Sequence, residues 1–194
     1  MKNKSSIYVA AFLVALVLVG GLIYMSGASQ NGAGGVGGGL FDNSSTTAST
    51  QNQNSGGNGG VVGAVFSSSD YAFSVTPLAD EIVSQMDDQG DGSATFVINK
   101  NGSGVVAQII VSPYDDTPES LTQAKITGDT GITASDWQKV PVGGAPALSF
   151  TDTSDSPESA QVWLVHSGFL YQISAEKSVV GSTLANIIAT LKLR

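Results

Sequence analysis

The feature that most constrains this chain is an apolar segment near its N-terminus, residues 7–25, which reads IYVAAFLVALVLVGGLIYM. Its 19 positions include no charged residue, and it lacks the polar stripe that a surface helix of a globular domain carries. At about 1.5 Å per residue, a helix of this length extends roughly 28 Å, close to the roughly 30 Å of a bilayer's hydrocarbon core. We therefore predict a transmembrane helix that contacts the lipid bilayer.

The charges on either side of this segment predict its orientation. Lys2 and Lys4 precede it, and the next basic residue is Lys100. The positive-inside rule therefore places the N-terminus in the cytoplasm and residues 26–194 outside. The small residues Ser26–Ala28 leave open a second interpretation, a signal peptide cleaved after that triplet, although such peptides usually have a shorter apolar region of about 7–15 residues. Both interpretations predict an extracytoplasmic protein, and the length of the segment favours an uncleaved, single-pass membrane anchor.

Low complexity separates this segment from the rest of the chain. Residues 26–63 are mostly Gly, Ser, Asn, Gln, Thr and Ala, and Asp42 is their only charge. So few large apolar side chains cannot offset the entropy lost on ordering, and we predict a disordered, flexible linker. The predicted organisation is a cytoplasmic tip and signal anchor in residues 1–25, the linker in 26–63, and an extracytoplasmic domain in 64–194.

Composition excludes several classes of function. From Ser26 onward, six basic and sixteen acidic residues give a formal charge of −10. Because so acidic a domain repels phosphate backbones, we expect no nucleic-acid partner. The chain has no cysteine, which excludes disulfides, thiolate catalysis and cysteine-bound metals.

Alternating side chains and turn residues predict many strands in the outer domain. Residues 71–77 alternate apolar and polar side chains and end at a proline, as a strand does. Three further pairs of strand-like segments are separated by Asn101-Gly102, Gly143-Gly144 and Ser167-Gly168, short turn sequences typical of β-hairpins. The paired segments are 93–100 with 104–112, 136–142 with 145–152, and 160–167 with 169–176.

Two segments are predicted to be helical, and a third is ambiguous. Residues 117–126 begin with Thr-Pro-Glu, which supplies a candidate N-cap, a proline suited to the first helical position and an acid for the positive helix end. Residues 178–191 carry apolar side chains at three- and four-residue intervals, and residues 78–87 do so less regularly. A last short strand is expected in 192–194. This order predicts an α+β domain, with a mainly antiparallel sheet flanked by two or three helices.

The opening FSVTP at 73–77, the hairpin strand FLYQIS at 169–174 and the closing helix that runs into ATLKL at 189–193 resemble segments of the PsbP/Mog1-like domains. The resemblance covers about residues 71–194 and rests on pattern rather than on a specific motif. The chain departs from the family in lacking an aromatic residue soon after Pro77, and in having Leu191 where an aromatic is usual. The resemblance implies an antiparallel sheet flanked by helices and a binding or assembly role. The family shares no catalytic residues, so none carry over.

The sequence QMDDQGDGSATF, residues 85–96, raises the question of a calcium site. In an EF-hand-type loop that began at Asp87, Asp91 would be the fifth-position ligand and a glycine would follow it, as required. The twelfth position requires a bidentate glutamate, but here it is Ile98, inside a predicted strand. Asp87 and Asp91 are thus the only metal candidates, and an acidic turn is the simpler interpretation.

Other chemical motifs lack the partners that they need. Asp129 and Asp152 each precede a threonine, as in aspartic proteases, but the 23 residues between them are too few for two lobes. His166 is the only histidine, and the chain has no nucleophile-elbow motif to accompany it. Glycines in 32–37 match GxGxxG without the flanking strand and helix of a nucleotide site. We expect no catalytic residue and no cofactor.

We therefore predict a non-enzymatic binding or assembly module at the cell envelope, with an envelope protein as its candidate partner. Two alternatives stay open: a hydrolase that uses clustered aspartates or His166, and a surface structural subunit. An enzyme predicts a concave pocket with facing ionisable groups. A binding module predicts an exposed apolar or aromatic patch, and a structural subunit predicts self-association through the apolar helix or a sheet edge.

Overall fold

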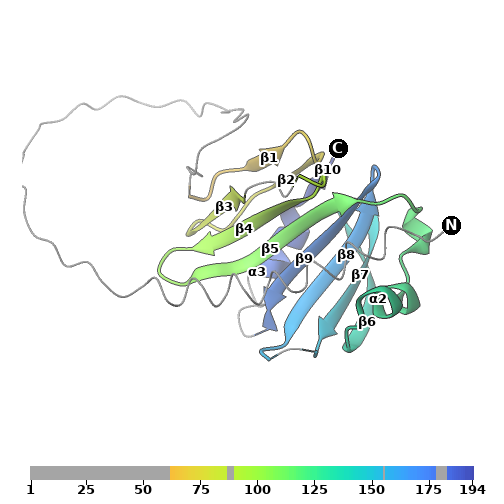
Figure 1. Ribbon diagram of the computed structural model, residues 1–194. Helices are drawn as coiled ribbons and strands as arrows, with labels where there is room; N and C mark the ends of the chain where they lie inside the picture. The colour runs from red at the N-terminus through yellow and green to blue at the C-terminus, as the bar shows by residue number, and fades with distance from the viewer. Residues whose placement is uncertain (1–61, 87–89, 155, 178–182) are drawn as a thin grey trace, which may run out of the picture.

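The structure is a computed structural model that describes residues 62–86, 90–154, 156–177 and 183–194 (Figure 1). These residues belong almost wholly to the domain predicted in 64–194. The predicted transmembrane helix and nearly all of the predicted linker lie outside them. No helix in the described part of the chain is long and apolar enough to cross a membrane.

Seven strands form one antiparallel sheet in the order β3-β4-β5-β9-β8-β7-β6. Strands that follow one another in sequence are neighbours in each half, and β5 pairs with β9 where the halves meet. The sheet thus consists of two meanders that are joined edge to edge. Their strands are β3 Glu81–Gln85, β4 Ala94–Lys100, β5 Gly104–Pro113, β6 Ala134–Val142, β7 Ala145–Asp152, β8 Ser159–His166 and β9 Phe169–Glu176.

A smaller sheet brings the two ends of the described domain together. Its order is β1-β2-β10, from β1 Phe66–Ser68, β2 Phe73–Val75 and β10 Lys192–Leu193. The buried hydroxyl of Tyr171, on β9, donates a hydrogen bond of 2.6 Å to the carbonyl of Tyr71, just before β2. Burial raises the pKa of Tyr171 to about 12, so this phenol keeps its proton and the bond at neutral pH.

One face of the large sheet is fully covered. The small sheet and helix α3, Thr183–Thr190, pack against it, and α3 is the helix that lies behind the strands in Figure 1. Phe96, on β4, meets the ring of Phe73 edge to face at 5.0 Å. Burial of such a side chain contributes about 1.5–3 kcal/mol. The fully buried members of this core include Phe73, Phe96, Ile109, Tyr171 and Ile187.

The opposite face is covered at one end only. The connection from β5 to β6 contains a 3-10 turn, η1 Pro118–Ser120, and helix α2, Gln123–Thr130. Ile126 of α2 packs with Phe150 on β7 and Trp163 on β8 in a second, smaller core. The described members of this core come from α2, from its flanking segments and from strands β6 to β9, so it leaves β3, β4 and β5 outside it.

The three predicted hairpins are confirmed. β4 pairs with β5, β6 with β7 and β8 with β9, each across the predicted turn. Gly143 shows why such turns need glycine, because its φ is +58° and an added Cβ would lie 2.9 Å from the Cγ of Leu193. The predicted short strand at 192–194 is also present, as β10.

The predicted α+β class is wrong for the described residues. Strands take up 51% of these residues and helices 16%, which makes the domain a mostly antiparallel β-sheet protein. Each α-helix has only eight residues, so the prediction of a sheet flanked by two or three helices gave helices too much weight. The further part of that class prediction, a transmembrane helix followed by a disordered linker, concerns residues that the structure does not describe.

Two segments account for the error: 78–87, which the sequence left ambiguous, and the helix predicted in 117–126. Residues 78–87 have apolar spacing that fits a helix, but 81–85 form the edge strand β3, where Val83 is buried in the main core and its neighbours are half-buried. In 117–126 the proline only begins a 3-10 turn. Thr122, not Thr117, caps α2, since its side chain accepts a hydrogen bond of 3.2 Å from the backbone N–H of Lys125.

Candidate binding surface

The uncovered part of the sheet is the candidate functional surface. Figure 1 views the sheet from this side, and no described helix lies in front of β4, β5 and β9 there. Side chains alternate along a strand, so the residues between the core positions of β4, β5 and β9 point to this side. We call this surface the open face and define it by Ser84, Thr95, Val97, Gln108, Ile110, Gln172 and Ser174.

Strand register arranges these side chains in two rows. In the first row Thr95 pairs with Ile110, which pairs with Gln172. In the second row Ser84 pairs with Val97, Val97 with Gln108, and Gln108 with Ser174. Neighbouring strands lie about 4.8 Å apart, so each row presents polar groups at regular intervals, with one aliphatic side chain among them.

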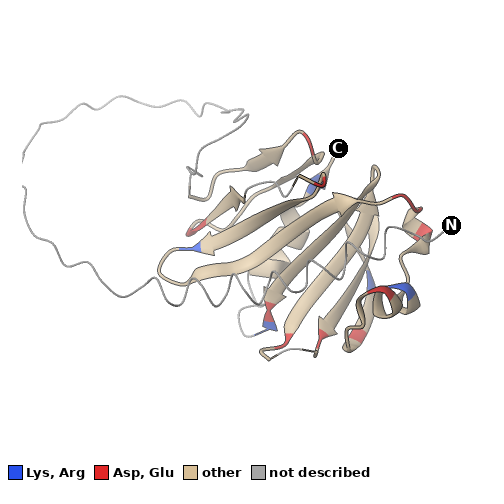
Figure 2. Ribbon diagram, in the orientation of Figure 1, with Lys and Arg blue, Asp and Glu red and all other residues tan. Residues whose placement is uncertain are grey.

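The open face carries no charge. None of its seven residues is acidic or basic, and Figure 2 shows the charged residues at the ends of the strands and on the connections rather than along the middle of β4, β5 and β9. The surface is half-buried for the most part, with Ile110 and Ser174 each 8% exposed. Ile110 and Ser174 are therefore buried, whereas the other five residues are half-buried.

Hydrogen bonds fix the border of the open face but leave its glutamines available. The indole N–H of Trp163 donates to Gln161 Oε1 at 3.2 Å, and Gln161 Nε2 donates to the hydroxyl of Ser159 at 2.8 Å. These residues continue the two rows onto β8. By contrast, no described residue hydrogen-bonds to the side-chain amides of Gln108 and Gln172.

An aromatic stack lies beyond this border. The rings of Trp137 and Phe150 are stacked at 4.3 Å, and Phe150 meets Trp163 edge to face at 5.7 Å. Phe150 and Trp163 are buried beneath the η1–α2 connection. The stack therefore belongs to the smaller core, and its rings are not an exposed aromatic platform on the open face.

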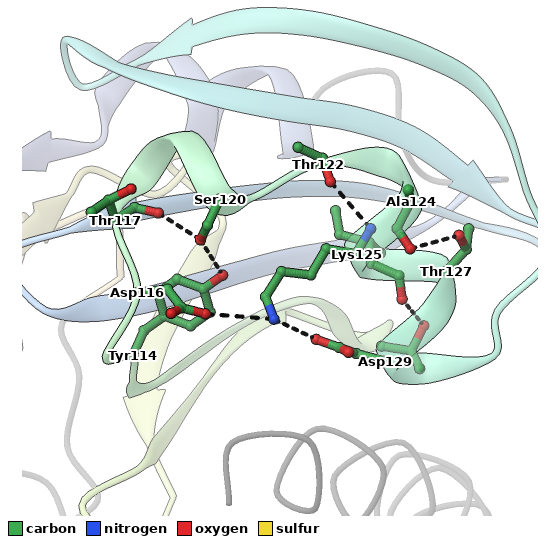
Figure 3. A network of polar contacts seen from close by, with 11 residues as sticks. Tyr114, Asp116, Thr117, Ser120, Thr122, Ala124, Lys125, Thr127 and Asp129 are labelled. Atoms are coloured by element: carbon green, nitrogen blue, oxygen red, sulfur yellow. Dashed lines mark hydrogen bonds and ion pairs between the residues drawn. The ribbon is translucent and has the colours of Figure 1, made fainter. Parts of the chain in front are cut away.

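A polar network holds the η1–α2 connection in place (Figure 3). Lys125 Nζ lies 2.9 Å from Asp129 Oδ2 and 3.6 Å from Asp116 Oδ2, so it joins the helix to the segment before it. The hydroxyls of Tyr114 and Ser120 are 2.9 Å apart. The hydrogen bond to Asp129 raises the pKa of Lys125 above its ordinary value. This network fixes how far the connection extends over the sheet.

The predicted metal candidates do not form a described site. Asp87 lies outside the described residues. Asp91 is exposed, and its Oδ1 accepts a hydrogen bond of 2.9 Å from the backbone N–H of Ser93, as in a self-bonded acidic turn. Among the described residues no group of three or more His, Cys, Asp or Glu side chains is placed to hold a metal ion.

The residues considered for hydrolysis have separate local partners. His166 Nε2 lies 3.1 Å from the backbone carbonyl oxygen of Arg194, beside β10. Asp129 pairs with Lys125 on α2. Asp152 Oδ1 accepts a hydrogen bond of 2.9 Å from the backbone N–H of Ser154. Each of these three residues thus has a local partner of its own, and the contacts do not join any two of the three.

Sequence reasoning missed the open face. A partial signal was present, since YQIS in β9 alternates apolar residues with uncharged polar ones, whereas Ile109–Val111 in β5 are three apolar residues in a row. The alternation shows which side chains point away from the core. It does not show that β5 pairs with β9, and this pairing is what assembles the rows.

Comparisons with known proteins name no family for this chain. No protein-family model and no curated protein matches it. One solved structure, a crystal structure at 1.50 Å resolution of a protein from Bacteroides thetaiotaomicron VPI-5482, is similar with a TM-score of 0.38 and 14% identity. The match covers 69% of this chain and 49% of that chain, so this chain spans about half its length. The resemblance to PsbP/Mog1-like domains gains no support from these comparisons and stays a prediction.

Proposed function

We propose that this protein is a non-enzymatic binding module, anchored in the membrane by residues 7–25 and held outside the cell membrane, and that the open face is its binding surface. One observation carries the proposal: the part of this sheet face formed by β4, β5 and β9 has no described covering layer, and none of the seven side chains that define it is charged. Five of its seven residues are polar and none is charged, so the face offers groups that donate and accept hydrogen bonds to an uncharged partner.

The chemistry of the face supports an uncharged partner. Gln108 and Gln172 offer amides that no described residue uses, and Val97 supplies a half-buried aliphatic surface between polar neighbours. Interface centres are typically poor in charged residues. The rest of the domain carries the acidic charge, which keeps it soluble beyond the membrane and leaves the open face as its neutral region.

A labelling experiment tests the proposal, because the absence of cysteine makes single-cysteine variants selective. Full-length Gln108→Cys and, as a matched control, Gln138→Cys on β6 are expressed in cells that naturally make the protein. Each is treated with a membrane-impermeant maleimide, in intact cells and after purification. We expect both variants to be labelled from outside, and only the thiol of Gln108→Cys to react several-fold more slowly in cells than when purified.

Two results would contradict the proposal. Equal reactivity of the 108 position in cells and in purified protein would show that nothing occupies the open face. Labelling that requires permeabilised cells would show that the domain is not outside the membrane.

A further inference from the structure

We infer that Asn101, at the tip of the β4–β5 hairpin, is a site of spontaneous modification, where water converts the side-chain amide to a carboxylate through a cyclic imide. The route needs a following residue whose backbone nitrogen can reach the side-chain carbonyl carbon. Glycine suits that position best, because it has no Cβ to obstruct the approach. Asn101 is followed by Gly102, whereas the other two asparagines among the described residues, Asn99 and Asn186, are followed by a lysine and an isoleucine.

The hairpin tip leaves the reacting atoms accessible. Residues 101–105 are all exposed, and no described residue hydrogen-bonds to the side-chain amide of Asn101. A Cβ built on Gly102 would meet nothing within 4 Å, so no neighbouring element restricts motion at this point. By contrast, Asn99 is paired on both sides in the sheet, and Asn186 Nδ2 donates a hydrogen bond of 2.7 Å to a backbone carbonyl just after β2.

The turn itself is held by one backbone hydrogen bond. The N–H of Ser103 donates to the carbonyl of Lys100 at 3.0 Å, and Gly102 has a φ of +78°. The N–H of Gly102, which supplies the attacking nitrogen, is bonded to no described residue. Attack requires rotation about the Cα–C bond of Asn101, so the turn must open locally first. Such an opening costs far less at an exposed hairpin tip than inside a packed strand or helix.

The reaction balances with water as its only co-reactant. The backbone nitrogen of Gly102 gives up its proton and attacks Cγ of Asn101, and a five-membered imide forms as ammonia leaves. Water then adds to one of the two imide carbonyls and breaks its bond to the nitrogen. Opening at Cγ yields aspartate, whereas opening at the main-chain carbonyl yields isoaspartate, in which the chain runs through Cβ and Cγ.

Either product changes the structure of the tip. Aspartate places a new carboxylate next to Lys100, whose Nζ lies 3.4 Å from Asp80 Oδ2. Isoaspartate adds one methylene to the main chain inside the turn, so the hydrogen bond from Ser103 to Lys100 cannot keep its geometry. The backbone N–H of Asn101 also donates to the carbonyl of Asp80 at 3.1 Å. A displaced tip therefore loosens the segment that precedes β3 as well.

The test follows purified full-length protein, in detergent, during storage at neutral and at mildly alkaline pH. Fragmentation mass spectrometry localises the gain of about 1 Da that replacement of NH2 by OH causes. We expect Asn101 to convert at least about tenfold faster than Asn99 and Asn186, which react only when their strand or helix opens. The product should contain isoaspartate as well as aspartate, and the rate should rise with pH, because attack requires a deprotonated nitrogen.

Two variants serve as controls. Asn101→Gln should stay unconverted over the same period, because its longer side chain would have to close a six-membered ring. Asn101→Asp carries the charge of the product without the added methylene. Wild-type protein that has largely converted should therefore melt at a lower temperature than freshly purified Asn101→Asp.

Three results would overturn the inference. The first is conversion at Asn101 no faster than at Asn99 and Asn186, which would show that the tip does not favour the reaction. The second is aspartate without isoaspartate, because direct hydrolysis of the amide gives aspartate alone. The third is an equal melting temperature for converted wild type and Asn101→Asp, which would show that the turn is not loosened.

Discussion

The two sides of the seven-stranded sheet are built from the same strands but differ in what covers them. On the side of α3, the small sheet and the helix bury a core with members on all seven strands, from β3 to β6. On the other side, the η1–α2 connection covers only the end that carries Phe150 and Trp163. The difference teaches that the described residues pack the sheet mainly from one side, so a substitution on the open face should disturb folding less than one in the main core.

The largest expected effect compares adjacent residues of β4 that point to opposite sides. Phe96→Ala removes a fully buried ring that contacts Phe66, Tyr71 and Phe73. We expect a loss of about 3–5 kcal/mol in the free energy of unfolding, the cost of truncating a core phenylalanine. Val97→Ala, on the half-buried open face, should cost under about 1 kcal/mol. Urea unfolding measures both, and equal losses would show that both sides are packed alike.

A smaller effect is expected at the junction of β3 with α3. Glu81 is fully buried, and its carboxylate accepts hydrogen bonds from the backbone N–H of Leu78 and from the hydroxyl of Thr183, at the start of α3. Glu81→Ala leaves the buried hydroxyl of Thr183 and the part-buried N–H of Leu78 without this acceptor, so we expect a loss of about 1–3 kcal/mol. The control Gln85→Ala, exposed on the same strand, should be near neutral. A neutral Glu81→Ala variant would show that this carboxylate does not fasten α3 to the sheet.

The smallest effect concerns the network that holds α2. The pKa of Lys125 is raised, chiefly by its hydrogen bond to Asp129, so its contribution to stability is complete below its ordinary pKa and lost as pH rises through the raised value. Asp129→Asn should cost about 0.2–0.5 kcal/mol at pH 8, the range of a helical i,i+4 pair. The difference in melting temperature between wild type and variant should disappear as pH rises through the raised pKa of Lys125. A difference that grows with pH would contradict this account.

The sequence predicted the hairpins well because their signals are local. Asn101-Gly102 and Gly143-Gly144 supply the backbone conformations that tight turns need, and the alternating residues beside them fix strand and register together. The ambiguity of 78–87 has an equally local cause. Apolar residues three and four positions apart fit a helix and a short edge strand alike, and only pairing with β4 decides between them.

The open face could not be predicted, because it depends on contacts distant in sequence. Gln108 and Ser174 lie opposite each other only because β5 pairs with β9, and no local pattern encodes that pairing. The coverage of one end of the sheet depends on the position of α2. That position follows from the cap at Thr122 and the ion pair of Lys125 rather than from the helix start predicted at Thr117.

The asymmetry between the two sides is the central claim, and adjacent residues of β5 test it most directly. Ala107 is 3% exposed in the main core, whereas Gln108 is half-buried on the open face. In a chain without cysteine, purified Ala107→Cys and Gln108→Cys each carry one thiol, and a maleimide measures its accessibility. We predict that the thiol of Gln108→Cys reacts at least about a hundredfold faster than that of Ala107→Cys, which reacts only when the core opens. Equal rates would contradict the account, because they would mean that both sides of the sheet are covered, or open, to the same degree.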